Sequence, residues 1–199
     1  MKIIVFTFLL LLFIPVISKA QESKTCSASP QSIIVRGFKL GMTETEVKRR
    51  FPKISIWEQS GDTGLTYVAE QMSSSSFRET FTEADREGIS AIDLNFIEKK
   101  LARIAIKYTG FTEWKSITEF TDAIAKSLKL PLAINWQKLD DEKLRVSCNG
   151  FFAEVHFTPK LSPYILQAQS LTLSISDYEN ILKQREQTKN ERQKQVFKP

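Results

Sequence analysis

The sequence predicts an α+β protein in which short capped helices pack on an antiparallel β-sheet. A Ser or Thr precedes a Glu by three residues at Thr43, Ser116 and Ser176, a pattern typical of helix N-termini. Several short segments alternate apolar and polar side chains, which is typical of half-buried strands. The 199 residues are 42% hydrophobic and 26% charged, as in globular proteins.

Residues 1–20 are predicted to be a secretory signal peptide. Lys2 supplies the basic start, an apolar run follows, and Ser18 and Ala20 place small residues before a cut at Gln21. An uncleaved membrane anchor is the alternative, but Pro15 interrupts the run, which is shorter than the roughly 20 residues of a membrane span. After cleavage we expect no membrane span and a secreted or periplasmic location.

The two cysteines would then lie in an oxidising compartment. A Cys26–Cys148 disulfide is the simplest pairing, and two free buried thiols are the alternative. Cys26 would lie in an extended N-terminal segment, residues 21–35. Two cysteines and one histidine are too few for a zinc site with roughly four His and Cys ligands, and we predict neither a metal nor a cofactor.

The charge pattern argues against nucleic acid as a partner. The formal net charge is +5, of which Lys2 and Lys19 belong to the predicted signal peptide. Lys and Arg form no cluster with interleaved aromatic residues, so no nucleic-acid site is expected. The chain also lacks the phosphate-binding P-loop, the dinucleotide-binding and the nucleophile-elbow motifs.

Residues 36–110 are expected to form a first helix-plus-sheet unit. Its helix begins after Thr43 and ends before a proline. Glu46 completes the capping box, and Met42 and Val47 occupy the positions of a hydrophobic staple.

Strands are predicted at 92–96 and 102–108, and short strands near Trp57 and Tyr67. Because the apolar residues of the first two strands must share a face, we expect an odd-numbered turn between them. The turn would have three residues, with Lys100 left-handed, or five. Residues 71–88 are expected to form a long polar loop with a helical turn around 82–86.

Residues 111–176 are expected to form a second unit, whose helix begins after Ser116 and ends before Pro131. Asn149-Gly150 is a strong signal for a tight hairpin turn. It predicts three outward-facing pairs: Ser147/Phe152, Arg145/Glu154 and Lys143/His156. A last strand is expected at 171–175, where Leu171, Leu173 and Ile175 alternate with polar residues, and residues 177–199 are expected to form a polar, charged helix.

A sequence pattern that occurs twice suggests that the two units are a tandem repeat. Each helix is followed by a proline and, five residues later, by a tryptophan, in the pairs Pro52 and Trp57, and Pro131 and Trp136. Chance is the alternative, because the helix interiors do not align well. In either case we expect both tryptophans in the core.

Residues 36–52 begin R-G-F-K-L-G-M-T-x-x-E-V. In this stretch Gly41 permits a turn, Met42 and Val47 form the hydrophobic staple, and Thr43 and Glu46 form the capping box of the helix. The G-M-T-x-x-x-V pattern resembles the BamE (SmpA/OmlA) envelope lipoproteins and the secreted β-lactamase-inhibitor proteins, which carry a helix-plus-sheet unit twice in tandem. Similar stretches open uncharacterised exported bacterial proteins. The resemblance implies an exported scaffold that binds other proteins through sheet or loop surfaces. The chain has neither a lipidated Cys at the predicted cut nor an inhibitory loop that matches.

If the helices cover one face of the sheet, the other face is polar and mixed. It would carry Asp93, Asn95, Arg103, Lys107, Arg145, Ser147, Phe152, Glu154 and His156. The candidate partner-binding residues are Phe152, His156, Arg145, Arg103 and Lys107, because aromatic and Arg side chains anchor many interfaces. The alternative is a solvated face whose charges pair across strands.

The predicted function is a non-enzymatic binding or adaptor module of the bacterial envelope, with an envelope or secreted protein as partner. Two alternatives stay open: a small-ligand carrier with an apolar pocket between sheet and helices, and a hydrolase without a recognisable motif. A hydrolase would use His156 with Glu154 as base and orienting group, and no nucleophile is identifiable by spacing. Residues 140–142 are acidic but lack the glycine and spacing of a calcium loop, which favours a solvated turn.

Overall fold

The computed structural model describes residues 26–58, 65–71, 73–109, 114–158 and 164–172, and the single positions 180, 183 and 187. The predicted signal peptide lies outside the described residues, as does nearly all of the predicted helix 177–199. The described residues have the α+β fold that the sequence predicts, with one antiparallel sheet and a few short helices.

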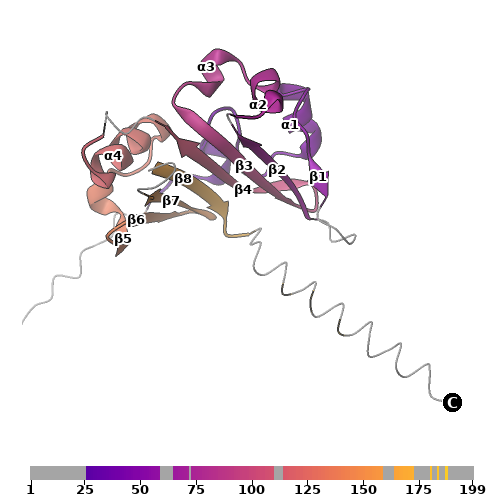
Figure 1. The fold of residues 1–199 in the computed structure, drawn as a ribbon. Coiled ribbons are helices and arrows are strands. Elements are labelled where there is room, and N and C mark those ends of the chain that lie inside the picture. Colours follow the sequence, from indigo (N-terminus) through magenta and orange to yellow (C-terminus); the bar gives the residue numbers. More distant parts are fainter. Residues whose placement is uncertain are drawn as a thin grey trace, which may run out of the picture.

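Eight strands form the sheet in the order β1-β2-β3-β4-β8-β7-β6-β5 (Figure 1). Their bounds are β1 Trp57–Glu58, β2 Leu65–Gln71, β3 Ile89–Ile97, β4 Lys100–Tyr108, β5 Gln137–Asp140, β6 Lys143–Cys148, β7 Phe151–Phe157 and β8 Tyr164–Ser170. β4 and β8 pair antiparallel at the centre. Because β4 ends the first four strands along the chain and β8 ends the second four, both parts of the chain build one continuous sheet.

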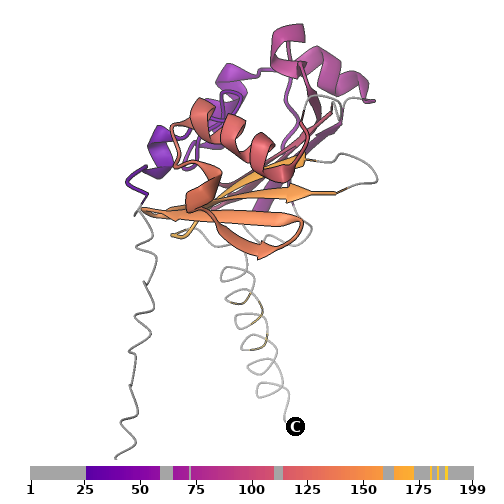
Figure 2. The ribbon, with the colours of Figure 1, turned by 90° about the vertical axis from the view of Figure 1, so that its left-hand side faces the viewer.

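The helices lie on one side of this sheet (Figure 2). They are α1 Glu44–Arg50, α2 Ser75–Thr80, α3 Glu83–Arg86 and α4 Ile117–Leu128, with 3-10 turns η1 Pro30–Ser32 and η2 Ala133–Asn135. α4 contacts β6 and β7, and α2 contacts β2. We call the opposite face of the sheet the open face. Within the described part of the chain, no helix is long and apolar enough to cross a membrane.

Both described helix starts that the sequence predicts are confirmed. The Thr43 Oγ1 accepts the Glu46 N–H at 3.2 Å, and the Glu46 Oε2 accepts the Thr43 N–H at 2.7 Å. At α4 the Ser116 Oγ accepts the Glu119 N–H at 3.2 Å. The Glu119 carboxylate, however, accepts the N–H of Lys115 instead of the cap residue, so this capping box is only half formed.

The residues before α1 attach that helix to the sheet. Gly41 adopts a φ of +83°, which glycine takes at little cost, and its N–H donates to the Leu101 carbonyl at 2.8 Å. The Leu101 N–H donates to the Met42 carbonyl at 2.8 Å. Met42 and Val47 are both buried in the core, so the G-M-T-x-x-x-V stretch positions α1 against the start of β4.

The hairpin between β6 and β7 has the predicted register. Cys148 pairs with Phe151, and the pairing runs without a shift to Lys143 and His156. Gly150 adopts a φ of +81°, which only glycine takes readily. The turn therefore sends the three predicted outward pairs to the open face.

The turn between β3 and β4 differs from the prediction. It has two residues, Glu98 and Lys99, with φ of +47° and +64°, and it closes the Ile97–Lys100 pair. A two-residue turn alone would put the apolar residues of the two strands on opposite faces. The register shifts near Ala102, so a β-bulge there adds the residue that the turn lacks.

The last strand lies earlier than predicted. β8 spans residues 164–170, and Leu171 lies in a bend with an exposed side chain. Leu173 and Ile175 lie outside the described residues. Within β8, Tyr164, Leu166 and Ala168 are buried. Gln167 and Gln169 fit an alternating strand, but Ile165 interrupts the alternation, and the pattern of Leu171, Leu173 and Ile175 is more regular.

Residues 71–88 are more ordered than the predicted polar loop. The expected helical turn is confirmed as α3, but α2 was not predicted. Phe77 in α2 and Phe81 after it are buried and fasten this segment to the sheet.

Two aromatic clusters fill the core between the helices and the sheet. The first aromatic cluster comprises Phe38, Phe51, Phe77 and Phe81, with neighbouring ring centroids 4.7 to 6.2 Å apart. The second aromatic cluster comprises Tyr108, Trp114, Phe120, Phe157 and Tyr164, with centroids 4.4 to 5.9 Å apart. The first cluster comes from the first half of the chain alone, whereas the second joins Tyr108 of β4 to residues of the second half.

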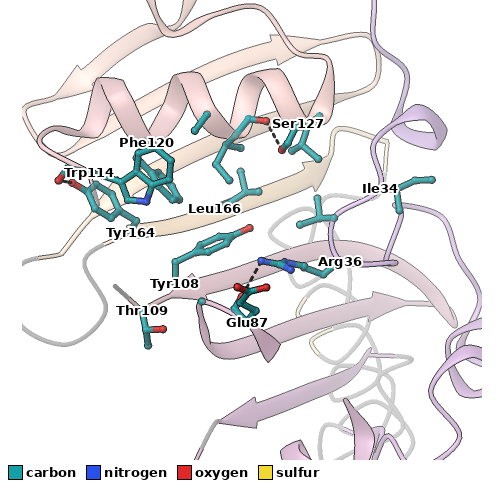
Figure 3. A pocket seen from close by; sticks show the side chains of 15 residues that line it. Ile34, Arg36, Glu87, Tyr108, Thr109, Trp114, Phe120, Ser127, Tyr164 and Leu166 are labelled. Atoms are coloured by element: carbon teal, nitrogen blue, oxygen red, sulfur yellow. Dashed lines mark hydrogen bonds between the residues drawn. The ribbon is translucent and has the colours of Figure 1, made fainter. Parts of the chain in front are cut away.

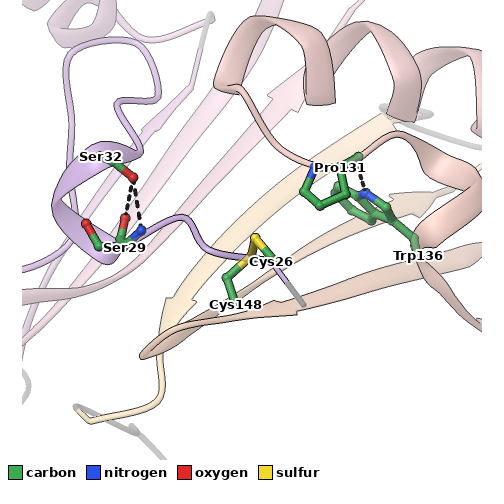
Figure 4. The surroundings of a disulfide bond; sticks show 6 residues. All are labelled: Cys26, Ser29, Ser32, Pro131, Trp136 and Cys148. Carbon is green, nitrogen blue, oxygen red and sulfur yellow. Dashed lines mark hydrogen bonds between the residues drawn. A yellow bond between two sulfur atoms is a disulfide. The ribbon is translucent and has the colours of Figure 1, made fainter. Parts of the chain in front are cut away.

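Cys26 and Cys148 form a disulfide bond, as predicted (Figure 4). Their Cα atoms are 4.6 Å apart and 122 positions apart in sequence. The bond fastens the start of the described chain to the end of β6. Pro30 lies so close to the β6–β7 turn that a Cβ at Gly150 would be 3.4 Å from the Pro30 side chain. The N-terminal segment is thereby held at the β6–β7 turn.

Candidate functional site

The strand registers bring all nine predicted open-face residues to the same side of the sheet. Asn95 pairs with Arg103, Arg103 with Gln169, and Gln169 with Phe152. This row continues to Tyr67 and Trp57 on one side and to Ser147 on the other. A parallel row runs from Asp93 through Ala105, Gln167 and Glu154 to Arg145.

Arg103 lies at the centre of the open face and is held by amide groups. Its Nη1 donates to the Asn95 Oδ1 and its Nη2 to the Gln167 Oε1, each at 3.0 Å. The Gln167 Nε2 donates onward to the Gln169 Oε1 at 3.3 Å. These side-chain hydrogen bonds, two of them between strands and one along β8, fix the rotamers of the side chains, so the middle of the face is preorganised.

Lys107, another predicted site residue, forms an ion pair with Asp93 at 3.1 Å. Both side chains are partly exposed. This geometry is the cross-strand charge pairing that a solvated face also shows. The positive charge of Lys107 is therefore already paired with Asp93 within the open face.

Glu154 is the most enclosed polar group of the open face, with 3% of its surface exposed. Its carboxylate accepts the Arg145 Nε–H at 2.6 Å, contacts the His156 Nε2, and lies 3.9 Å from the Lys143 Nζ. Burial alone would raise the pKa of Glu154, but bonds from His156 and Arg145 and their charges outweigh it and lower the pKa. The carboxylate therefore stays ionised and anchors three cationic or imidazole side chains.

We expect Glu154→Gln to destabilise the fold at neutral pH and to matter less in acid. Because the folded pKa lies below the ordinary 4.5, the stabilisation is complete above that value and is lost as the pH falls through the folded pKa. Losing charged hydrogen bonds costs about 2 kcal/mol at pH 7. Urea unfolding at pH 7 and at pH 3 measures both values.

Asp141→Asn is the control for this test. Asp141 forms an exposed ion pair with Lys138, and such pairs add little to stability because solvent screens them. A loss for Glu154→Gln that is the same at both pH values would contradict the charge-based account.

Aromatic side chains lie on either side of the centre of the open face. The Arg145 guanidinium stacks over the Phe152 ring at 4.5 Å. On the far side, Trp57 and Tyr67 are cross-strand neighbours with 57% and 39% of their surfaces exposed. The prediction that both tryptophans lie in the core is wrong for Trp57, because β1 is a two-residue edge strand with both side chains exposed. It is confirmed for Trp136.

The acidic turn after β5 is internally bonded. The Asp140 Oδ1 accepts the Glu142 N–H at 2.8 Å, and Asp141 pairs with Lys138. Among the described residues, no group of three or more His, Cys, Asp and Glu side chains is arranged to hold a metal ion.

His156 contacts Glu154, the pairing that a base and its orienting group would need. The other polar groups at this carboxylate are the Arg145 and Lys143 cations. The pair is thus part of a charge cluster around the Glu154 carboxylate. Comparison of the chain with protein-family models, with curated proteins and with solved structures found no match.

Proposed function

We propose that this protein is a non-enzymatic binding module that holds a protein partner against the open face of its sheet. The observation that carries the proposal is the row of open-face residues with aromatic groups on either side of its polar centre. Trp57 and Tyr67 lie on one side, and Phe152 with Arg145 lies on the other. Trp, Tyr and Arg are the residue types that dominate the binding energy of protein interfaces.

The size of this surface fits a protein better than a small molecule. Trp57 and Phe152 are separated by five strand-to-strand steps, which at about 4.8 Å each gives about 24 Å. A standard interface buries about 800 Å² on each partner, which corresponds to a patch of that breadth. The polar centre between the aromatic groups is already hydrogen-bonded through Arg103, so little side-chain ordering remains to oppose binding.

We infer that the protein acts outside the cytoplasm. The N-terminal sequence has the pattern of a signal peptide, and a disulfide bond is typical of oxidising compartments. An envelope or secreted protein is therefore the proposed partner, in the periplasm or outside the cell.

We also propose that the chain is a tandem duplication, in keeping with its resemblance to the BamE-like and β-lactamase-inhibitor proteins. The order of elements supports this, because α1 precedes β1 to β4 and α4 precedes β5 to β8. From the centre of the sheet to its edges, the strands follow in the order β4, β3, β2, β1 on one side and β8, β7, β6, β5 on the other. α2 and α3 occur in the first half only, as an insertion between β2 and β3.

Affinity capture with the oxidised, tagged full chain tests the binding proposal. We expect one stoichiometric protein from an envelope extract of the producing cell, released by Phe152→Asp and by Trp57→Ala. With the purified partner, each variant should weaken binding at least about 30-fold, the effect of losing roughly 2 kcal/mol at a hot spot.

Ile134→Asp is the matched control. Ile134 is 79% exposed and lies in η2, away from the open face, so this variant adds the same charge elsewhere and should bind as the wild type does. A partner that remains bound to both open-face variants, while these stay folded, would exclude this face as the interface.

A further inference from the structure

A cavity of about 660 Å³ lies on the helix side of the sheet, away from the open face. α4 and the ends of β4 and β8 form its walls, and the segment around Arg36 and the residues before β3 close the other side (Figure 3). Cavities of about 300–1,000 Å³ are the usual size of small-molecule sites. The proposed protein-binding surface uses none of this space.

One wall of the cavity is aromatic and rigid. Phe120 stacks on Tyr164 with ring centroids 4.4 Å apart and meets Trp114 edge-on at 5.9 Å. The Tyr164 hydroxyl donates to the Trp114 carbonyl, so its polar atom is already engaged within the wall. Leu166 completes an apolar surface against which a ring or a short hydrocarbon chain would pack.

The opposite end of the cavity is polar. Figure 3 shows the Tyr108 hydroxyl and the Arg36 guanidinium pointing toward one another. Burial raises the pKa of Tyr108, and the nearby Arg36 offsets this only in part, so the hydroxyl remains a hydrogen-bond donor at neutral pH. The Arg36 Nη2 donates to the Glu87 carbonyl at 3.0 Å, which leaves most of its five N–H donors for other acceptors.

The backbone of Arg36 points to a role for its side chain. Val35 and Phe38 exchange two hydrogen bonds around a two-residue turn, in which Arg36 has a φ of +49° and Gly37 a φ of +86°. Turns with two positive φ values favour Asn, Asp and Gly at both positions, and a residue such as Arg pays a conformational cost there. This unfavourable backbone conformation occurs at Arg36, whose guanidinium lines the cavity.

The charge of Arg36 is not neutralised by an ion pair within the described part of the chain. The ion pairs found there involve other residues. Glu87 also lines the cavity, but it meets Arg36 through its backbone carbonyl, and its side chain is exposed. An anionic group entering the cavity would find a guanidinium and a hydroxyl donor side by side.

We propose that this cavity binds a small amphipathic anion. Its aromatic or short aliphatic body would pack against Phe120, Tyr164 and Leu166, and its carboxylate or sulfonate would accept hydrogen bonds from Arg36 and Tyr108. The proposal is independent of the open face, because the two surfaces lie on opposite sides of the sheet and share no residue.

Two fluorescent probes that differ by one charged group test the proposal on the full chain. Anilinonaphthalene sulfonate carries a sulfonate, and phenylnaphthylamine is the same aromatic body without it. We expect saturable one-to-one binding of the sulfonate probe. Arg36→Asn should weaken that binding about tenfold or more, because charged hydrogen bonds contribute about 1.5–3 kcal/mol, and should leave the uncharged probe unaffected. Asn suits the turn, so this variant should fold at least as well as the wild type.

Two further variants separate the cavity from the rest of the surface. Ala123 lines the cavity from α4, and Ala123→Phe should fill it and remove the binding of both probes. Arg78 in α2 is exposed, and Arg78→Gln removes the same charge as Arg36→Asn without changing either affinity.

Sulfonate binding that is unchanged in Arg36→Asn would overturn the anion-binding role of Arg36. Binding of both probes that is unchanged in a folded Ala123→Phe variant would overturn the cavity as the site. Phe152→Asp should bind both probes as the wild type does, so failure of the protein-binding proposal and failure of this one are distinguishable.

Discussion

Replacing Cys26 and Cys148 with serine is expected to lower the free energy of unfolding by about 4–5 kcal/mol. The disulfide links positions 122 residues apart, and in the chain-entropy model a cross-link over so long a loop strongly restricts the unfolded chain. For a protein of this size the loss corresponds to a fall in melting temperature of roughly 10–20 °C. Thermal and urea unfolding of the oxidised protein and of the double variant measure both quantities.

The reduced wild-type protein is the control for this prediction. It keeps both cysteine side chains but loses the cross-link, so its stability should match that of the double serine variant within about 1 kcal/mol. Equal stability of the oxidised and reduced forms would contradict the prediction. If both thiols of the unreduced protein reacted with a maleimide, the bond itself would be excluded.

Phe38→Ala should lower the free energy of unfolding by about 3–5 kcal/mol, the usual cost of removing a buried phenylalanine. Phe38 is fully buried, and its ring centroid lies 4.7 Å from that of Phe51 and 6.2 Å from that of Phe81. The substitution leaves a cavity between rings that come from three separate segments. These segments cannot close together without moving α1 or α2, so the cavity persists. Urea unfolding at constant pH measures the loss.

Phe38→Leu distinguishes lost volume from lost hydrophobic burial. It keeps most of the apolar surface and should cost less than about 2 kcal/mol, in line with other changes of shape in a packed core. A Phe38→Ala variant as stable as the wild type would mean that the first aromatic cluster does not close the fold. Probe binding in the cavity beside Arg36 should survive in the leucine variant.

The sequence predicts the elements whose signals are local. The Thr43 and Glu46 capping box joins residues three positions apart, and the observed hydrogen bonds match it. The Asn149-Gly150 turn determines the pairing of its two flanking strands, and all three outward pairs follow from it. In each case the interacting groups are close in sequence, so the local sequence pattern is enough to predict how they are arranged.

The errors occur where a neighbouring strand or a packing contact decides. With its two-residue turn alone, β4 would present its apolar residues to the opposite side of the sheet from those of β3. The β-bulge at Ala102 brings both sets to the same side. β8 has a weak apolar pattern, yet it is held on both sides by β4 and β7. Trp57 was expected in the core because its side chain is large and apolar, but its place on an edge strand exposes it.

The sequence by itself determined the α+β class, the starts of α1 and α4, the β6–β7 register and the cysteine pairing, because each follows from short-range patterns or from the presence of only two cysteines. It also determined which side chains share a strand face. Only the tertiary structure decided that β4 meets β8, which brings Arg103 to Gln167 across 64 positions of sequence. The same pairing places Tyr108 opposite Tyr164, and the cavity beside Arg36 follows from it. No local pattern encodes such a contact, since its energy comes from burial shared between segments that are distant along the chain.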